Sequence, residues 1–167
     1  MKLWKSLVKG SFLVVPLVVC AAITMPEVKR STKKDSKERQ CLVEALTHEA
    51  LNQPIRGQMA VLDVIKNRVN DKRFPNSTCG VVHQSKAFSY RNDLKAGTIK
   101  YVTFRNHIDK VAIRNIENLV DWHLKGSYTP VLSNSAMWYT RIEIKRSWMK
   151  NMQTEVVLGS HKFMKEI

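Results

Sequence analysis

The spacing of apolar residues predicts three helices in the region that follows residue 36. Apolar positions recur every three or four residues over residues 37–50, over 54–69 and over 104–125, as in helices with one buried face. The second stretch opens with Pro54, which suits the first turn of a helix. The residues expected to face inward are Met59, Ala60, Val61, Val64, Ile65 and Arg68 in the second helix, and Ile108, Val111, Ala112 and Leu119 in the third.

Beyond Gly126 the pattern changes to short apolar stretches that are typical of strands. Residues 136–139 and 154–158 are such stretches, and residues 141–145 alternate cleanly between polar and apolar. A helical front part followed by a small β-rich part is an α+β arrangement. Residues 41–167 are of ordinary length for one such domain.

Glu49 lies at an unusual position in the first predicted helix. Leu42, Ala45, Leu46 and Glu49 fall at helical spacing, so the glutamate shares a face with apolar residues. A carboxylate on such a face loses hydration, and its pKa rises toward the range in which it can donate a proton. A boundary glutamate that bends out to water fits the same pattern equally well.

Residues 1–26 have the pattern of a secretory signal peptide or a signal-anchor segment. Three lysines precede an uncharged run over residues 10–26 whose centre is rich in Val and Leu. The run is short for a permanent span, which needs roughly 20 apolar residues. Cleavage near Ala22, retention as a weak anchor and later release from the bilayer all stay open. The pattern predicts an exported protein of the periplasm or cell wall, anchored through residues 10–26 if the segment is retained.

Charge is concentrated at the front of the chain. The 167 residues include 28 Lys and Arg against 14 Asp and Glu, which gives a formal charge of +14. Residues 1–40 carry +6 of this charge and residues 41–167 carry +8. Residues 27–40 contain almost nothing that could be buried, so they predict a basic tether or the first exposed turn of a helix. The excess predicts an anionic partner, and composition does not choose among nucleic acid, a phospholipid surface and an anionic polymer.

Three cysteines give two alternatives. Cys20 lies in the signal-like segment, which leaves Cys41 and Cys79 for the folded part. In an exported domain these two would form one disulfide, whereas in the cytosol two free thiols would be the default. Cys20, if retained, could compete for either partner.

Most catalytic motifs are absent from the sequence. There is no zinc-protease spacing after His48, no His-x-His pair, no Gly-x-Ser-x-Gly and no phosphate-binding glycine loop. Neither a metal nor a cofactor is therefore expected. The candidate acid Glu49 remains, together with aromatic and polar residues that could line a glycan cleft but are individually more often core residues. These cleft candidates are Phe88, Ser89, Tyr90, Trp138, Tyr139, Trp148 and His161.

A series of short motifs runs through the folded part in a fixed order. The motifs are Cys41-Leu42, His48-Glu49-Ala50, Gly57-Gln58-Met59-Ala60-Val61, Asn67-Arg68-Val69, Phe74-Pro75, Cys79-Gly80-Val81-Val82, Phe88-Ser89 and Gly159-Ser160-His161-Lys162-Phe163. The series resembles the cell-wall hydrolase family typified by the spore-cortex lytic enzyme SleB. The resemblance covers about residues 40–164.

The resemblance implies a lysozyme-like or lytic-transglycosylase-like fold that acts on peptidoglycan. It implies that Glu49 is the catalytic acid, that Cys41 pairs with Cys79, and that no cofactor is needed. The chain departs from the family after the His-Glu-Ala motif, where it has Leu-Asn-Gln at residues 51–53 instead of Arg-Gly-Glu. The acid itself is retained, so activity is expected, with altered contacts to the substrate.

Two mechanisms and two classes of function follow from these residues. A hydrolysing glycosidase needs a second carboxylate, for which Asp63 and Asp93 are candidates that no motif ties to Glu49, whereas a lytic transglycosylase needs Glu49 alone. The expected partner is the glycan strand, cut between N-acetylmuramic acid and N-acetylglucosamine by a monomer that is either a phage endolysin or a bacterial wall-remodelling enzyme. The inner membrane is a partner only if residues 1–26 are retained, and nucleic acid is not expected. The alternative is a basic wall-, membrane- or nucleic-acid-binding protein without turnover.

Overall fold

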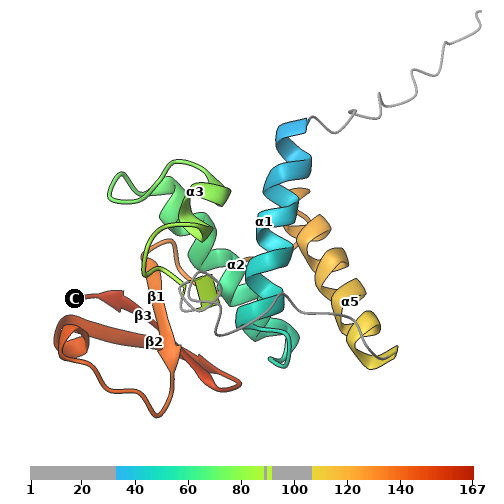
Figure 1. Ribbon diagram of the computed structural model, residues 1–167. Coiled ribbons are helices and arrows are strands. Elements are labelled where there is room, and N and C mark those ends of the chain that lie inside the picture. The colour runs from blue at the N-terminus through green and yellow to red at the C-terminus, as the bar shows by residue number, and fades with distance from the viewer. Residues whose placement is uncertain (1–32, 89, 92–106) are drawn as a thin grey trace, which may run out of the picture. The chain divides into compact units, whose positions relative to one another are not determined.

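The computed structural model describes residues 33–88, 90–91 and 107–167. The predicted signal segment, residues 27–32 of the predicted tether, Ser89 and Asp93 lie outside these ranges. Within these ranges, helices precede a small sheet (Figure 1). The helices are α1 (Lys33–Glu49), α2 (Ile55–Asn70), α3 (Thr78–Val82) and α5 (His107–Leu124); the later elements are β1 (Ala136–Arg141), the 3-10 helix η1 (Ser147–Asn151), β2 (Met152–Leu158) and β3 (His161–Glu166). Within the described ranges, no helix is long and apolar enough to cross a membrane.

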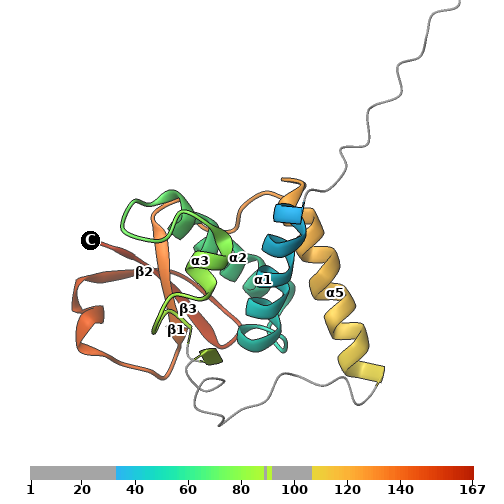
Figure 2. The same ribbon diagram turned by 45° about the horizontal axis from the view of Figure 1, so that its top comes forward.

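The first two helices supply nine of the 22 buried apolar residues in the described part of the chain. On α1, Leu42, Ala45 and Leu46 are buried, as their spacing predicts. Helix α2 follows Pro54, whose missing N–H costs nothing at a helix start. This helix contacts both α1 and β1, while α5 runs alongside α1 (Figures 1 and 2). The core therefore fixes the end of α1 against the sheet.

The start of α1 differs from the prediction. The helix begins at Lys33 instead of about Lys37, so residues 33–40 of the predicted tether are helical. Lys, Glu and Arg are good helix formers even where they are exposed. Arg39 also donates to Asp121 of α5 at 2.7 Å, which anchors this polar turn to the neighbouring helix. Residues 33–40 are therefore helical although most of their side chains are exposed to solvent.

Helix α5 matches its predicted range, but the prediction of its buried residues is partly wrong. Leu119 is buried as expected, together with Ile113 and Ile116, whereas Val111 is 44% exposed. Val111 precedes Ile113 by two residues, which places the two on nearly opposite sides of a helix. Ala112 is half-buried, and the side chain of Ile108 lies outside the described part.

The sheet has the order β1-β3-β2 with antiparallel neighbours. Strands β1 and β2 confirm the predictions for residues 136–139 and 154–158. The predicted strand at 141–145 is wrong, because beyond Arg141 these residues form a turn and an irregular segment. Its apolar residue Ile142 is 46% exposed, so the alternation does not mark a buried face. The central strand β3 was missed, although its Phe163 and Met164 are buried.

The turn between β2 and β3 is tied to the turn after α1. Gly159 has a φ of +59°, a left-handed conformation that favours glycine. A side chain at this position would also collide with Gln53, so the backbone approaches closely here. The Ser160 N–H donates to Gln53 Oε1 at 2.9 Å. The hairpin is thereby held next to the end of α1, where Glu49 lies.

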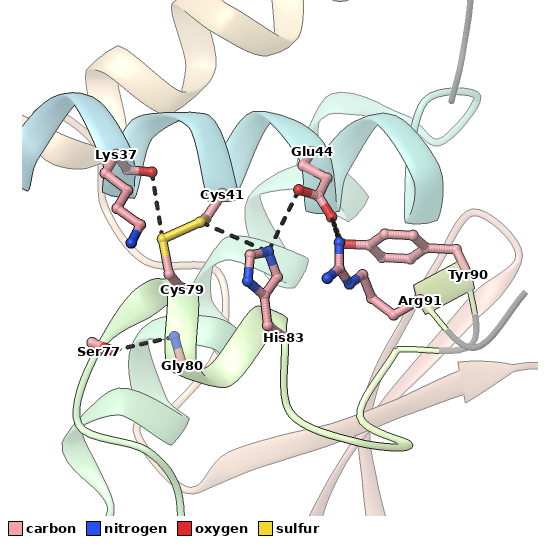
Figure 3. The surroundings of a disulfide bond; sticks show 9 residues. All are labelled: Lys37, Cys41, Glu44, Ser77, Cys79, Gly80, His83, Tyr90 and Arg91. Carbon is pink, nitrogen blue, oxygen red and sulfur yellow. Dashed lines mark hydrogen bonds and ion pairs between the residues drawn. A yellow bond between two sulfur atoms is a disulfide. The ribbon is translucent and has the colours of Figure 1, made fainter. Parts of the chain in front are cut away.

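A disulfide joins Cys41 of α1 to Cys79 of α3, with a Cα–Cα distance of 5.4 Å (Figure 3). This pairing confirms the expectation drawn from the family resemblance. Cys41 is buried in the core, and the side chain of His83 lies beside the bridge and 3.5 Å from Glu44. The bond links the helix that carries Glu49 to α3.

Removing this disulfide should destabilise the fold. It closes a loop with a sequence separation of 38 residues, which corresponds to about 3–4 kcal/mol in the chain-entropy account. In a Cys20→Ala background, which retains the bridge, Cys41→Ala/Cys79→Ala should unfold at lower denaturant concentration. Urea unfolding followed by circular dichroism measures the difference. Equal midpoints in the two proteins would show that the link contributes nothing.

Candidate active site

A cleft of about 700 Å³ lies beside the C-terminal end of α1. Its walls come from that helix end, from the loop after α3, from β1 and from the segment leading into η1. Among the described residues that line it, Glu49 is the only carboxylate. The lining includes Arg68, Trp138, Tyr139, Trp148 and His161. Four of the seven predicted cleft residues are therefore brought together with the predicted acid.

Glu49 is the last residue of α1 and is largely withdrawn from solvent. The Tyr139 hydroxyl donates to Glu49 Oε2 at 3.0 Å. Burial raises the pKa of Glu49 above its ordinary value, and this effect outweighs the Tyr139 hydrogen bond and the positive charges of Arg141 and Arg68, which lower it. The negative end of the helix dipole acts in the same direction as burial. The arrangement favours a protonated carboxyl group that can donate.

Arg68 is a buried cation that the sequence analysis placed on an apolar stripe of the second helix. Its side chain is 5% exposed and its Nε donates to the Met137 carbonyl at 2.8 Å. The guanidinium lies over the rings of Phe74, at 5.3 Å, and Trp138, at 5.4 Å. It also interacts electrostatically with Glu49. An arginine within an apolar helical period is the signal that could have identified it.

Two tryptophans form an aromatic surface in the cleft. The ring centroids of Trp138 and Trp148 are 5.8 Å apart with an angle of 44° between the planes. Trp148 is 44% exposed, whereas Trp138 is packed edge-on against Phe74. One partly exposed indole supported by a second suits the apolar face of a sugar ring.

His161 and Tyr139 form the part of the cleft closest to the sheet. They lie diagonally across the paired strands β1 and β3, with ring centroids 5.4 Å apart, because Tyr139 pairs with Phe163 and His161 pairs with Arg141. His161 is 6% exposed, and burial, with a smaller effect from Arg141, lowers its pKa. A neutral imidazole at this position supports the ring of Tyr139 without adding charge.

Phe88 and Tyr90 do not line the cleft, in contrast to the prediction. Phe88 is 1% exposed and Tyr90 is 4% exposed, so both belong to the core. The ring of Tyr90 stacks on His48 with centroids 4.6 Å apart, and its hydroxyl donates to Glu44 at 3.2 Å. Burial in the core removes more apolar area of these rings from water than a position on an open cleft wall would. Ser89 lies outside the described residues.

Asp63, one of the two candidates for a second catalytic carboxylate, has a structural role. It accepts hydrogen bonds from the N–H groups of Val131, at 2.7 Å, and Leu132, at 3.2 Å, and from the Tyr128 hydroxyl. It fixes the segment before β1 and does not line the cleft. Asp93 lies outside the described part. Among the residues that the structure describes, no group of three His, Cys, Asp or Glu side chains could hold a metal ion.

This geometry can be compared with known proteins. The sequence profile of the Cell Wall Hydrolase family matches residues 52–164, about two thirds of the chain. The chain belongs to the Cell Wall Hydrolase family. The match confirms the resemblance stated above, and it begins three residues after Glu49.

Curated relatives of this family member include spore cortex-lytic enzymes. The enzyme of Bacillus cereus is 33% identical over 111 residues, which cover 64% of this chain and 40% of the relative. That of Oceanobacillus iheyensis is 28% identical over 125 residues, which cover 72% of this chain and 43% of the relative. The chain thus spans about two fifths of the length of these relatives.

Solved structures give the same assignment for the fold. The catalytic domain of the Bacillus cereus SleB protein is 28% identical with a TM-score of 0.53, and the match covers 78% of this chain and 91% of that one. The catalytic domain of the germination-specific lytic transglycosylase SleB from Bacillus anthracis is 25% identical with a TM-score of 0.53, covering 84% and 100%. The predicted α+β class, similar to catalytic domains of this family, is confirmed.

Proposed function

We propose that this protein is a peptidoglycan-degrading enzyme that cuts the glycan strand between N-acetylmuramic acid and N-acetylglucosamine. The observation that carries the proposal is a single, largely buried carboxyl group, Glu49, in a cleft of about 700 Å³. Membership of the Cell Wall Hydrolase family and similarity to SleB catalytic domains support the substrate class. The wall then places the working enzyme outside the cytoplasm, in agreement with the signal-like segment.

Glu49 acts as the acid in the first step. Burial raises the pKa of this carboxyl group, which favours the protonated form that can transfer its proton to the glycosidic oxygen as the bond to the muramyl C1 breaks. Arg68 and Arg141 then stabilise the carboxylate that is left behind, and Tyr139 holds it in place through the 3.0 Å hydrogen bond. The contacts that lower the pKa of Glu49 before the reaction are therefore the ones that stabilise its carboxylate after proton transfer.

The second step regenerates the acid. The ionised Glu49 accepts the proton of the muramyl C6 hydroxyl, whose oxygen bonds to C1 and closes a 1,6-anhydro ring. This route needs one carboxyl group, whereas hydrolysis through two carboxyl groups needs a partner. The described cleft lining contains no second carboxylate, and Asp63 is engaged elsewhere. We therefore favour a lytic transglycosylase over a hydrolase.

Replacing Glu49 with glutamine should abolish lysis, because the amide has the same shape but cannot donate the proton. A loss of at least about 100-fold is expected for a general acid. Clearing of a suspension of purified peptidoglycan sacculi measures the rate. Glu117→Gln, which removes a carboxylate on α5 away from the cleft, is the matched control and should retain the rate. Undiminished lysis by Glu49→Gln would refute the assignment, and absence of lysis by the unaltered protein would favour a binding protein without turnover.

The products should distinguish the two reactions. Transglycosylation leaves 1,6-anhydromuramyl ends, which are lighter by one water molecule than the reducing ends left by hydrolysis. Mass spectrometry of the soluble fragments should therefore find anhydro ends in nearly every new chain terminus. Reducing muramyl ends without anhydro product would show that water is the acceptor and that a second group assists Glu49.

A further inference from the structure

The cleft carries an excess of positive charge that the proton-transfer steps do not require. Besides the buried Arg68, its lining contains Lys86, Arg141 and Arg146, and Glu49 is the only carboxylate in the part of the lining that the structure describes. All three of the additional cations are exposed. We call Lys86, Arg141 and Arg146 the cationic rim.

The fold brings the cationic rim together from three separate segments. Lys86 lies in the loop after α3, Arg141 ends β1, and Arg146 immediately precedes η1. The charges are therefore not the solvated face of one helix, which would be the ordinary explanation for a basic run. Each segment turns a cation toward the same cleft.

The protein itself does little to neutralise this rim. Arg141 lies 4.0 Å from Glu143, and both side chains are about two-thirds exposed, so this pair is weak. None of the ion pairs found among the described residues includes Lys86 or Arg146. Like charges gathered at one cleft raise its free energy unless a ligand brings negative charge. The rim is therefore suited to an anionic ligand.

The backbone at Lys86 supports a binding role. Lys86 has a φ of +61°, and it is the one residue other than glycine with a positive φ within the described ranges. A left-handed conformation is unfavourable for lysine, which has a Cβ atom. Such strain is concentrated at ligand-binding segments, where the surrounding structure holds it in place. The conformation fixes the direction in which the lysine leaves the loop.

We propose that the cationic rim binds carboxylate groups of the muramyl part of the glycan strand, so that the enzyme prefers strands that carry these charges. The inference rests on the proposed function. The carboxylates could be the free lactyl group of N-acetylmuramic acid or those of an attached peptide stem, which share one chemistry. Trp148 also lines the cleft, and an aromatic surface beside cations matches a sugar ring that bears an acid.

Carboxylate binding at the rim would also assist the acid. Arg141 is one of the groups that lower the pKa of Glu49. A substrate carboxylate that neutralises Arg141 weakens this effect, so the protonated form of Glu49 is favoured when the correct strand is bound. Selection of the substrate and readiness of the acid would then depend on the same arginine.

Binding of the full-length Glu49→Gln protein to three forms of purified sacculi tests the inference without requiring turnover. The forms have intact peptide stems, stems removed by an amidase to leave lactyl carboxylates, and all carboxyl groups converted to amides with carbodiimide and ammonia. Co-sedimentation should give a Kd about tenfold higher for the amide form. Tighter binding to intact sacculi than to stripped sacculi identifies stem carboxylates as the ligand, and equal or tighter binding to stripped sacculi identifies the lactyl group.

Substitutions in the same background assign the effect to the rim. Arg141→Gln/Arg146→Gln should raise the Kd for untreated sacculi about tenfold. On the amide form, this variant and the Glu49→Gln protein without rim substitutions should have the same Kd. Arg141→Lys/Arg146→Lys keeps the charge and should retain most of the affinity. Lys72→Gln/Lys125→Gln removes two exposed charges outside the cleft lining and is the matched control. When the same rim substitutions are made in the enzyme that retains Glu49, they should raise KM more than they lower kcat.

Two results would overturn the inference. One is equal affinity for the amide form and untreated sacculi, and the other is equal loss of affinity in the rim and control variants. Both results are measured by co-sedimentation and do not require cleavage of the sacculi. Failure of the unaltered protein to cleave any sacculi would instead overturn the proposed function, so the two ideas are tested separately.

Discussion

The structure depends on holding one carboxyl group out of water at the end of a buried helix face. Glu49 continues the apolar face of α1, and burial raises its pKa more than Tyr139, Arg141 and Arg68 lower it. This balance matters for proton donation, because a raised pKa increases the fraction of the carboxyl group that is protonated at a given pH. The positive charge of the buried Arg68 limits how far the pKa of Glu49 rises. The same charge stabilises the carboxylate after the proton has left.

The rest of the fold restricts where that carboxyl group can move. The Gln58 side chain donates to the carbonyls of Ala50 and Gln53, each at 3.2 Å, and so fixes the turn directly after Glu49. The bond from the Ser160 N–H to Gln53 then ties this turn to the β2–β3 hairpin. The disulfide from Cys41 holds the same helix about two turns before Glu49. These contacts and the disulfide together restrict the end of α1, where Glu49 accepts the hydrogen bond from Tyr139.

Local spacing predicted the features that depend on one helix, and missed those that depend on distant segments. The period of α1 placed Glu49 on an apolar face, and the family resemblance added its role and the disulfide. The spacing did not reveal that Phe88 and Tyr90 pack in the core, because an aromatic residue has the same sequence pattern in a core and in a cleft. The central strand β3 was missed because its short His-Lys-Phe-Met run alternates poorly, and the strand is defined by pairing with β1 and β2. The cationic rim is likewise a product of tertiary structure, since its members are up to 60 residues apart in the sequence.

The central claim is that Glu49 is held in a state ready to donate a proton, and its titration tests this claim directly. Carbon-13 NMR of the glutamate carboxyl groups can follow Glu49 through a pH series, with its signal assigned by its absence in the Glu49→Gln protein. The account predicts a midpoint above the ordinary value of 4.5, because desolvation outweighs the nearby positive charges. A midpoint at or below 4.5 would contradict the account, since it would mean that Arg68, Arg141 and Tyr139 keep the resting group ionised.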